Sequence, residues 1–583
     1  MTIKMKITMN LVGTLLIAMT SMAFASTEPF KPLEPSANPK LLDFQKKNFT
    51  PAQLIKMGKR VRLAIGYSYA NFTFIEGNDG VIVVDTGLFT NRAKHALSDY
   101  QKLVDKPIVA IIYTHTHNDH RGGSPVFVKA ANKDIPIYGP SGWQERLDYD
   151  QSDQMELIKN RGISQFGILL PAGVTGTVGT GIGPITRMDG YSGYTLPNHT
   201  VPKEGMELTI SGVKMQFITT PGDIESHMMV WLPDEKVMIA GDTLGGTLPY
   251  LSTARFEADR DARKMAASLD LIMEYPAEYV ISGHGRPLIG KDDIKDVIIA
   301  TRDVSLFLAD QITRYARKGY SPDAIIDILK LPPHLAAHPD LQPHYHKLDW
   351  LIRGMYLKRG GWGKSTLALV RHTDSEEAKR MVELLGGVEK VVEHAVDAFK
   401  QTDYPWAVQL ATQALYVQPR HKLATRIKIE ALRGIAYTTE SANERNYALT
   451  KVAEMAGMLP WGEVYSKVSY VTRVKQTNSE LLALLESRFR AEEALELAME
   501  IAITVNNENE TTEHTIALRK GVLIYKNQVS TSPDAHITLD RKLLVTLSVG
   551  AISWLDALSQ NKINVDNGQS SVERFVKLID TIN

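Results

Sequence analysis

The chain has 583 residues, of which 44% are hydrophobic and 23% charged, an ordinary globular composition that suggests about three to four domains. Its 66 basic and 66 acidic residues give a formal net charge of zero, so the basic excess typical of a nucleic-acid-binding protein is missing. The absence of cysteine excludes disulfide scaffolds, thiolate nucleophiles, cysteine zinc sites and iron–sulfur clusters.

The first 25 residues predict a cleaved export signal. Lys4 and Lys6 precede an apolar stretch from Leu11 to Met22, and Ala23-Phe24-Ala25 is a small-x-small cleavage site. The alternative is a membrane anchor, but the apolar stretch is shorter than the roughly 20 residues that span a bilayer. We therefore expect a periplasmic or secreted protein with no stable membrane span.

Residues 26–300 predict a layered α/β domain. Short β-branched runs alternate there with helical stretches. Val81–Val84, Ile108–Ile112 and Val237–Ala240 are continuous apolar runs, which favour strands buried on both faces with helices packed outside.

Residues 301–458 predict a helical domain. Ile294 to Arg317 is strongly helical, and residues 375–458 carry apolar side chains at three- and four-residue spacing. The Pro- and His-rich segment 331–346 favours a lid or dimer-contact loop over a further metal site. Tyr404 to Glu430 has the pattern of one helix–turn–helix repeat, and a single unit is weak evidence for a repeat array.

Residues 459–583 predict a small α+β domain. Apolar residues alternate within 501–505, 515–518, 522–525 and 535–539 before a helical C-terminus. Such alternation favours an antiparallel sheet with one buried face.

The segment Thr114 to Gly123 (THTHNDHRGG) carries the strongest chemical signal. It directly follows the predicted strand, and imidazole and carboxylate are ligands that divalent metals such as zinc accept. His115 and His117 point the same way if the extended geometry continues, while Asp119 and His120 lie past a turn, near a second ion. With 16 histidines in 583 residues, three within this short motif indicate a metal site rather than a polar loop.

This HxHxDH motif resembles that of the metallo-β-lactamase superfamily, and the resemblance extends to other segments. Residues 71–77 and 83–87 resemble its opening hairpin and strand, in which Asp85 orients the metal-binding loop. Gly241-Asp242-Thr243 resembles the motif whose aspartate bridges two metals. Gly283-His284-Gly285 resembles the closing motif whose histidine completes the second site. The resemblance implies an αββα sandwich.

One position departs from the superfamily pattern. The usual Pro-Gly-His is Pro221-Gly222-Asp223 here, and Glu225 and His227 are alternatives for the missing ligand. An acidic residue at this place is typical of the alkylsulfatase branch, so we favour Asp223. The implied ligand sets are His115, His117 and Asp223 for one zinc ion and Asp119, His120 and His284 for the other, with Asp242 bridging them.

Further segments resemble the alkylsulfatases. Residues 346–363 and 381–387 are similar to segments of that family, and Tyr404-Pro405-Trp406-Ala407 with the following helices resembles its helical dimerisation domain. Residues 534–541 resemble part of its sterol-carrier-like C-terminal domain. The resemblance implies a catalytic domain (26–300), a dimerisation domain (301–458), a sterol-carrier-like domain (459–583) and a homodimer.

The family resemblance implies hydrolysis of alkyl sulfates to an alcohol and inorganic sulfate by a metal-activated hydroxide. Asp119 and Arg255 are the expected catalytic residues. Arg255 falls on the family's sulfate-binding arginine, whose planar fork matches two sulfate oxygens; a surface arginine is the alternative. This chain departs from the family's Glu-Asn at Asp242-Thr243 and from its His-Asn pair at Leu248-Pro249-Tyr250, which leaves the substrate range open.

Two other functions stay open. One is another hydrolase of the same fold, such as a lactonase, thioesterase, phosphodiesterase or β-lactamase, which the Gly241-Asp242-Thr243 and Gly283-His284-Gly285 motifs also suit. The other is a periplasmic amphiphile-binding protein with a vestigial metal site, which metal content would distinguish.

Overall fold

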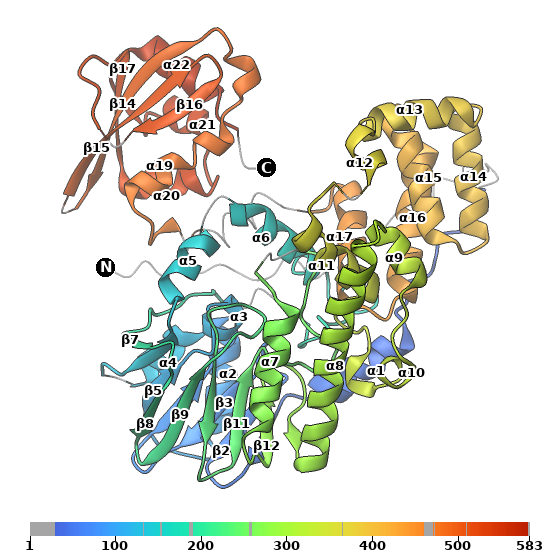
Figure 1. Ribbon diagram of the computed structural model, residues 1–583. Helices are drawn as coiled ribbons and strands as arrows, with labels where there is room; N and C mark the ends of the chain where they lie inside the picture. Colours follow the sequence, from blue (N-terminus) through green and yellow to red (C-terminus); the bar gives the residue numbers. More distant parts are fainter. Residues whose placement is uncertain are drawn as a thin grey trace.

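The computed structural model describes residues 29–580, apart from 132, 152–153, 186–189, 256–258, 364, 460–469, 471–472, 509 and 527. The expected export signal, residues 1–25, lies outside the described residues. Over the described part of the chain, no helix combines the length and apolarity that crossing a bilayer requires. Figure 1 shows an α/β part, a helical part and a C-terminal part with its own sheet.

Two sheets form the centre of the α/β part. The first has seven strands in chain order: β1 (Gln53–Met57), β2 (Val61–Ile65), β3 (Phe72–Glu76), β4 (Val81–Val84), β5 (Ile108–Ile112), β6 (Ile137–Pro140) and β7 (His199–Val201). The second has the order β13-β12-β11-β10-β9-β8, formed by β8 (Met206–Ile210), β9 (Val213–Thr219), β10 (Met228–Leu232), β11 (Val237–Gly241), β12 (Tyr279–Ser282) and β13 (Leu288–Ile289).

The two sheets pack face to face through one apolar layer. Side chains such as Leu63 and Ile82 of the first sheet share a buried cluster with Phe217 and Val230 of the second. Burial of each such side chain favours folding by about 1.5–3 kcal/mol. The predicted buried strands are confirmed as β4, β5 and β11, because their runs of Val, Ile and Ala face apolar neighbours on both sides.

Helices cover the outer faces of both sheets (Figure 1). The first sheet is covered by α2 and α4, and the second by α7 and α8. The α/β part is therefore an αββα sandwich, as predicted. Its helices are α1 (Pro39–Phe49), α2 (Thr90–Gln101), α3 (Asn118–Arg121), α4 (Ser124–Ala131), α5 (Trp143–Gln151), α6 (Gln154–Gln165), α7 (Ala262–Met273) and α8 (Lys291–Ala316).

The helical part follows without a break, since α8 runs through the expected domain limit at residue 300. Segment 331–346 contains two short helical turns, and the expected repeat-like unit consists of α15 and the first half of α16. Helices α14, α15 and α16 share one buried core. The elements are α9 (Pro322–Ile328), α10 (Pro333–Ala336), η1 (Pro339–Leu341), α11 (Leu348–Gly360), α12 (Thr366–Val370), α13 (Asp374–Leu384), α14 (Val388–Lys400), α15 (Tyr404–Val417), α16 (Lys422–Thr438) and α17 (Ala442–Met455).

The C-terminal part has a five-stranded sheet in the order β16-β15-β14-β17-β18. Its elements are α19 (Asn478–Ala483), η2 (Glu486–Arg488), η3 (Ala491–Glu493), β14 (Ala498–Asn507), β15 (Glu510–Arg519), β16 (Val522–Lys526), β17 (Ala535–Asp540), α20 (Arg541–Ser548), α21 (Trp554–Ser559), β18 (Asn564–Asn567) and α22 (Gln569–Lys577). The expected antiparallel sheet is corrected in one respect: β17 pairs with β14 in parallel, so the sheet is mixed. Alternation along a strand predicts a buried face but not the direction of its neighbour.

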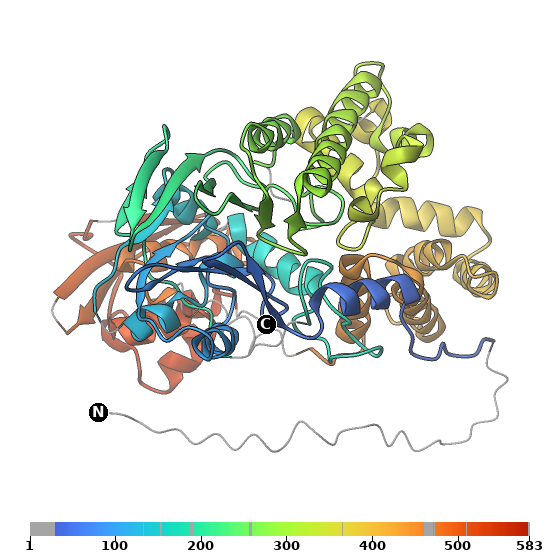
Figure 2. The same cartoon turned by 90° about the horizontal axis from the view of Figure 1, so that it is seen from below.

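One aromatic side chain connects the C-terminal part to the α/β part. The ring of Tyr194 has the Arg121 guanidinium 3.9 Å from its centroid and Lys475 Nζ at 3.3 Å, and Lys475 donates a 2.8 Å hydrogen bond to the Tyr194 carbonyl. Figures 1 and 2 show the C-terminal sheet and helices α13–α16 at opposite sides of the molecule. Because Arg121 ends the HxHxDHR segment, the C-terminal part lies next to the metal-binding motif.

Candidate metal centre

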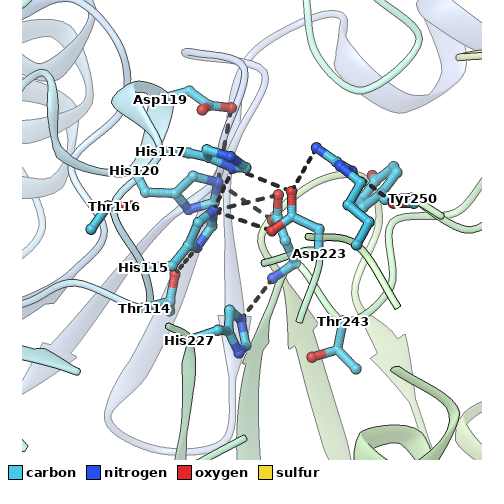
Figure 3. Close-up of polar contacts among 12 residues, drawn as sticks. Thr114, His115, Thr116, His117, Asp119, His120, Asp223, His227, Thr243 and Tyr250 are labelled. Carbon is cyan, nitrogen blue, oxygen red and sulfur yellow. Dashed lines mark hydrogen bonds and ion pairs between the residues drawn. The ribbon is translucent and has the colours of Figure 1, made fainter. Parts of the chain in front are cut away.

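The chemistry-bearing side chains meet at one edge of the sandwich. His115 and His117 follow β5, and Asp119 and His120 lie in α3. From the second sheet, Asp242 directly follows β11, His284 lies two residues beyond β12, and Asp223 is in the loop between β9 and β10. Parallel pairing of β4 with β5 and of β11 with β12 places these strand ends together. Figure 3 shows the histidine side chains facing Asp223 across the gap between the sheets.

The first group contains His115, His117, Asp223 and Asp242, all buried. His117 Nδ1 lies 3.2 Å from Asp223 Oδ2, and His115 Nε2 lies 3.7 Å from Asp223 Oδ1. His115 Nε2 is also 3.8 Å from Asp242 Oδ2. The structure thus brings Asp223, rather than a third histidine, to the two histidines of the motif.

The second group contains Asp119, His120 and His284. His284 Nε2 is 3.4 Å from Asp119 Oδ2 and 3.2 Å from Asp242 Oδ2. His120 Nε2 is 3.4 Å from Asp242 Oδ1. Asp242 therefore contacts both groups, as the bridging role expected for it requires.

These groups fit divalent ions. Ligands held tetrahedrally about 2.0–2.1 Å from zinc lie about 3.3 Å from one another, close to the separations above. Among the described residues, His120 Nε2, Asp223 Oδ1 and Asp242 Oδ1 are buried without a hydrogen-bond partner. Burying such atoms unpaired is costly, so a cation between them satisfies the site. Together with the family match reported below, the clusters indicate divalent-metal binding.

Outer contacts fix the orientation of each imidazole. The Nδ1 atoms of His115, His120 and His284 lie 2.9, 2.7 and 2.9 Å from Thr114 Oγ1, Asp85 Oδ2 and the Tyr69 carbonyl. Each of these histidines thus keeps Nε2 directed to the centre, the arrangement that orients a metal ligand. Asp85 also accepts a 2.9 Å hydrogen bond from the Thr114 amide, so the structure places it where the loop-orienting role requires.

The ionisable side chains of the centre strongly shift one another's pKa values. Burial alone would raise the pKa of Asp242, but His284 and His120 reverse this and hold it well below its usual value. Burial opposes protonation of His120, yet the carboxylates of Asp242, Asp85 and Asp119 raise its pKa well above the ordinary range. Asp242 is therefore ionised, and His120 and His284, whose pKa values are both raised, carry compensating positive charge when no metal does.

Three residues are alternatives for the ligand that replaces the histidine of the usual Pro-Gly-His motif, and the structure distinguishes between them. Asp223 is in the centre, whereas Glu225 is largely exposed and pairs with Lys264 at 2.7 Å. His227 is buried, with Nδ1 2.9 Å from the Thr220 carbonyl and Nε2 accepting a 3.2 Å hydrogen bond from the Asp242 amide. Both ring nitrogens of His227 are thus engaged, and Nε2 is the one that holds the Asp242 amide. Gly241 permits this approach, since a Cβ on it would collide with the His227 ring.

Arg255 lies beside an aromatic cluster rather than in either group. Its guanidinium carbon is 5.5 Å from the centroid of Phe166, which stacks on Tyr69 at 5.0 Å. Burial raises the pKa of Tyr69 well above its usual value, and the charge of Asp119 adds to the effect. Arg255 is thus linked to the centre through the stacked rings of Phe166 and Tyr69.

Sequence reasoning missed Arg260 and Tyr250. Arg260 is buried, and its Nη2 pairs with Asp223 Oδ2 at 3.0 Å. Tyr250 packs its ring edge-on against His284, with centroids 6.0 Å apart. The stretch that contains Arg260 reads as a solvated charged loop, so no sequence signal marks its burial. In the sequence, Tyr250 stands out only because it lies where the alkylsulfatases have a His-Asn pair.

The His-rich segment 331–346 gives no second metal cluster among the described residues. His338 pairs with Asp296 at 3.1 Å, and His344 stacks on Phe44 with centroids 4.0 Å apart. His346 is fully buried next to Tyr345 and Tyr250. These histidines pack the junction between the α/β and helical parts.

The fold and the site together define a protein of the metallo-β-lactamase superfamily, whose family model matches residues 65–284. The alkyl sulfatase dimerisation model matches residues 321–457, and the alkyl sulfatase C-terminal model matches residues 474–583. A linear primary-alkylsulfatase from a Pseudomonas strain is 30% identical over 519 residues, which cover 87% of this chain and 98% of the relative. The chain therefore belongs to the alkylsulfatase family.

Other relatives agree with this assignment. An alkyl/aryl-sulfatase from Saccharomyces cerevisiae is 27% identical over 539 residues, covering 90% of this chain and 82% of the relative. The solved structure of a stereoselective inverting sec-alkylsulfatase from Pseudomonas sp. is 26% identical, with a TM-score of 0.78, and covers 95% of this chain and 88% of that structure. The similarity thus spans all three parts of the chain.

Proposed function

We propose that this chain hydrolyses alkyl sulfate esters to an alcohol and inorganic sulfate at a centre of two zinc ions. The observation that carries the proposal is the convergence of seven buried or half-buried ligand side chains in a chain that is similar to an alkylsulfatase over 87% of its length. His115, His117 and Asp223 would hold one ion, Asp119, His120 and His284 the other, with Asp242 between them. Nitrogen and oxygen ligands without thiolates suit zinc.

The protein's own groups have distinct tasks in this reaction. Bound divalent ions supply a hydroxide nucleophile at neutral pH and neutralise negative charge. Asp85, His227 and Arg260 hold His120, Asp242 and Asp223 in position through the contacts described above. Arg255 is proposed to attract the sulfate group, since a guanidinium matches two of its oxygens.

The test is release of inorganic sulfate from dodecyl sulfate by purified, metal-loaded protein. We expect sulfate and alcohol in equal amounts, with loss of both after chelation and in His117→Ala. Release of product from lactones, thioesters or phosphodiesters, with none from alkyl sulfates, would instead assign the chain to another hydrolase of this fold. A protein that binds amphiphiles but retains no metal would be the vestigial-site alternative.

A homodimer and export belong to the same proposal. Helix α12 and its surroundings expose Trp362, Leu367 and Val370, each at about 70%, within the segment that matches the dimerisation model. An exposed apolar patch of this kind favours burial against a second copy, which a sedimentation mass near twice that of the mature chain would support. Export is proposed from residues 1–25, and N-terminal sequencing of the mature protein would find Ser26 first.

A sterol-carrier-like role is proposed for the C-terminal part. The alternating side chains of β14 and β17 pack into a buried core with Trp554 and Phe575. The alternating pattern motivates the hypothesis that this part also contacts the alkyl tail. Deleting residues 459–583 without changing the KM for long-chain substrates would reject it.

A further inference from the structure

Tyr250 is a buried tyrosine at the edge of the metal centre. Its side chain is 3% exposed, and its ring packs against His284 and, at 5.6 Å, against Tyr345. Arg260 donates a 2.7 Å hydrogen bond to the Tyr250 carbonyl and pairs with Asp223 through its other terminal nitrogen. Figure 3 shows Tyr250 on the Asp223 side of the centre. The same guanidinium therefore fixes both the Tyr250 backbone and a proposed ligand.

The hydroxyl of Tyr250 has no hydrogen-bond partner among the described residues. A buried hydroxyl without a hydrogen-bond partner is destabilising, so an unpaired hydroxyl held at the edge of the ligand cluster points to a bound group that accepts its hydrogen bond. The edge-on packing of the Tyr250 ring on His284, with centroids 6.0 Å apart, places the side chain at the centre. A phenol keeps its proton at neutral pH and can donate it in a hydrogen bond.

A sulfate ester needs a donor in this place. Its terminal oxygens carry negative charge, and Asp223 and Asp242 line this side of the centre with negative charge as well. A neutral donor at this edge of the centre attracts a sulfate oxygen without adding further negative charge. Within Leu248-Pro249-Tyr250, where the family has a His-Asn pair, Tyr250 has the only side chain that can donate.

We propose that the Tyr250 hydroxyl donates a hydrogen bond to an oxygen of the substrate's sulfate group, which makes Tyr250 a catalytic residue. This rests on the proposed function, because it assumes a sulfate group at the centre. The competing explanation is packing alone: the Tyr250 hydroxyl lies so close to Gly245 that a Cβ on this glycine would collide with it. Removing only the hydroxyl separates the two explanations.

The experiment compares Tyr250→Phe with Tyr100→Phe in the metal-loaded full chain. Tyr100 is a matched control because its buried ring stacks on Phe74, in the core between α2 and the first sheet, away from the metal centre. For Tyr250→Phe we expect kcat/KM for dodecyl sulfate to fall about 10- to 100-fold, the size of one hydrogen bond to a charged group. The inhibition constant of inorganic sulfate should rise, while metal content and melting temperature stay unchanged. Tyr100→Phe should leave kinetics and sulfate inhibition unaltered.

Unchanged kinetics and sulfate inhibition in metal-replete Tyr250→Phe would overturn the proposal, as would an equal loss in Tyr100→Phe. If Tyr250→Phe loses metal or does not fold, Gly245→Ala is the second variant, because its methyl group displaces the hydroxyl while the tyrosine remains. It should reproduce the loss of activity and the weaker sulfate inhibition, and normal values for both would contradict the proposal.

Failure of the proposed function is recognised separately. It would show as a metal-loaded wild-type protein that releases no sulfate. Calorimetry with inorganic sulfate then still tests Tyr250: weaker binding to Tyr250→Phe than to wild type supports the hydrogen bond, and equal or absent binding overturns it.

Discussion

At the scale of single residues, Asp223 shows how one carboxylate is shared between structure and chemistry. It lies 3.2 Å from His117 and 3.0 Å from Arg260, and it is 2% exposed. Burial would raise its pKa, but His117 and Arg260 lower it below the usual value, so the carboxylate stays ionised. A histidine at position 223 would leave the Arg260 guanidinium without the negative charge that now pairs with it. The buried arginine and the acidic ligand thus belong together.

Asp223→Asn removes this charge while keeping the size of the side chain. We expect the variant to lose about one equivalent of metal per chain and sulfate release to fall more than about 100-fold. Glu225→Gln is the control, because the exposed carboxylate of Glu225 pairs with Lys264 rather than with the centre. Metal analysis by mass spectrometry checks both. Loss of metal in Glu225→Gln with retention in Asp223→Asn would reverse the assignment.

His346 predicts a dependence of stability on pH. Burial lowers its pKa to about 3, and the positive charge of Arg260 adds to the effect. An unfolded histidine titrates near pH 6.5, so between about pH 6.5 and 3 the unfolded chain carries a proton that the folded chain lacks. The folded state therefore loses stability as pH falls through this window, with a slope that approaches about 1.4 kcal/mol per pH unit.

His346→Gln should flatten this slope, while His394→Gln, at an exposed position of α14, should not. Urea unfolding of chelator-treated protein at several pH values between about 7 and 5 measures it. Equal slopes for wild type and His346→Gln would show that His346 titrates normally.

Much of the centre was predictable residue by residue. His115, His117, Asp119 and His120 are contiguous, and Asp242 and His284 sit in short motifs directly after apolar strands. The Arg260 pairing and the Tyr250 hydroxyl were not predictable, because their burial depends on how the loop between β11 and α7 packs against the centre and the helical part, which no local pattern records.

At the scale of elements, continuous apolar runs identified β4, β5 and β11 because both faces of these strands are covered. Whether two strands pair in parallel or antiparallel was harder to predict. Residues 535–539 alternate as expected, yet β17 joins the far side of β14 and runs parallel to it. Close approach of helices was likewise invisible in sequence: Gly434 in α16 reads as a weak helix position.

Gly434→Ala should destabilise the helical part in spite of alanine's better helix propensity. A Cβ at Gly434 would lie 2.5 Å from the Tyr404 ring, a backbone-to-ring contact that leaves no room for a methyl group. We expect a loss of about 1–3 kcal/mol. Gly162→Ala in α6 is the control: nothing lies within 4 Å of its Cβ position, so it should gain about 0.5–1 kcal/mol. Calorimetry should show melting temperatures that shift in opposite directions, and a stabilised Gly434→Ala would refute the close packing.

At the scale of the whole molecule, each of the three parts has a separate relation to the centre. The αββα sandwich supplies all seven proposed ligands. The helical part covers one side of the centre with Tyr345 and His346, which pack on Tyr250. The C-terminal part reaches the metal-binding segment through Lys475, which contacts the same Tyr194 ring as Arg121. Loss of either outer part is therefore expected to disturb the surroundings of the centre rather than the ligands themselves.

The most direct measurement is a zinc titration of chelated protein with dodecyl sulfate present, in which inorganic sulfate release and bound metal are followed together. We predict that release appears as the protein approaches about two ions per chain, because Asp242 contacts both ligand groups. A protein that binds its full complement of metal and releases no sulfate would contradict the account.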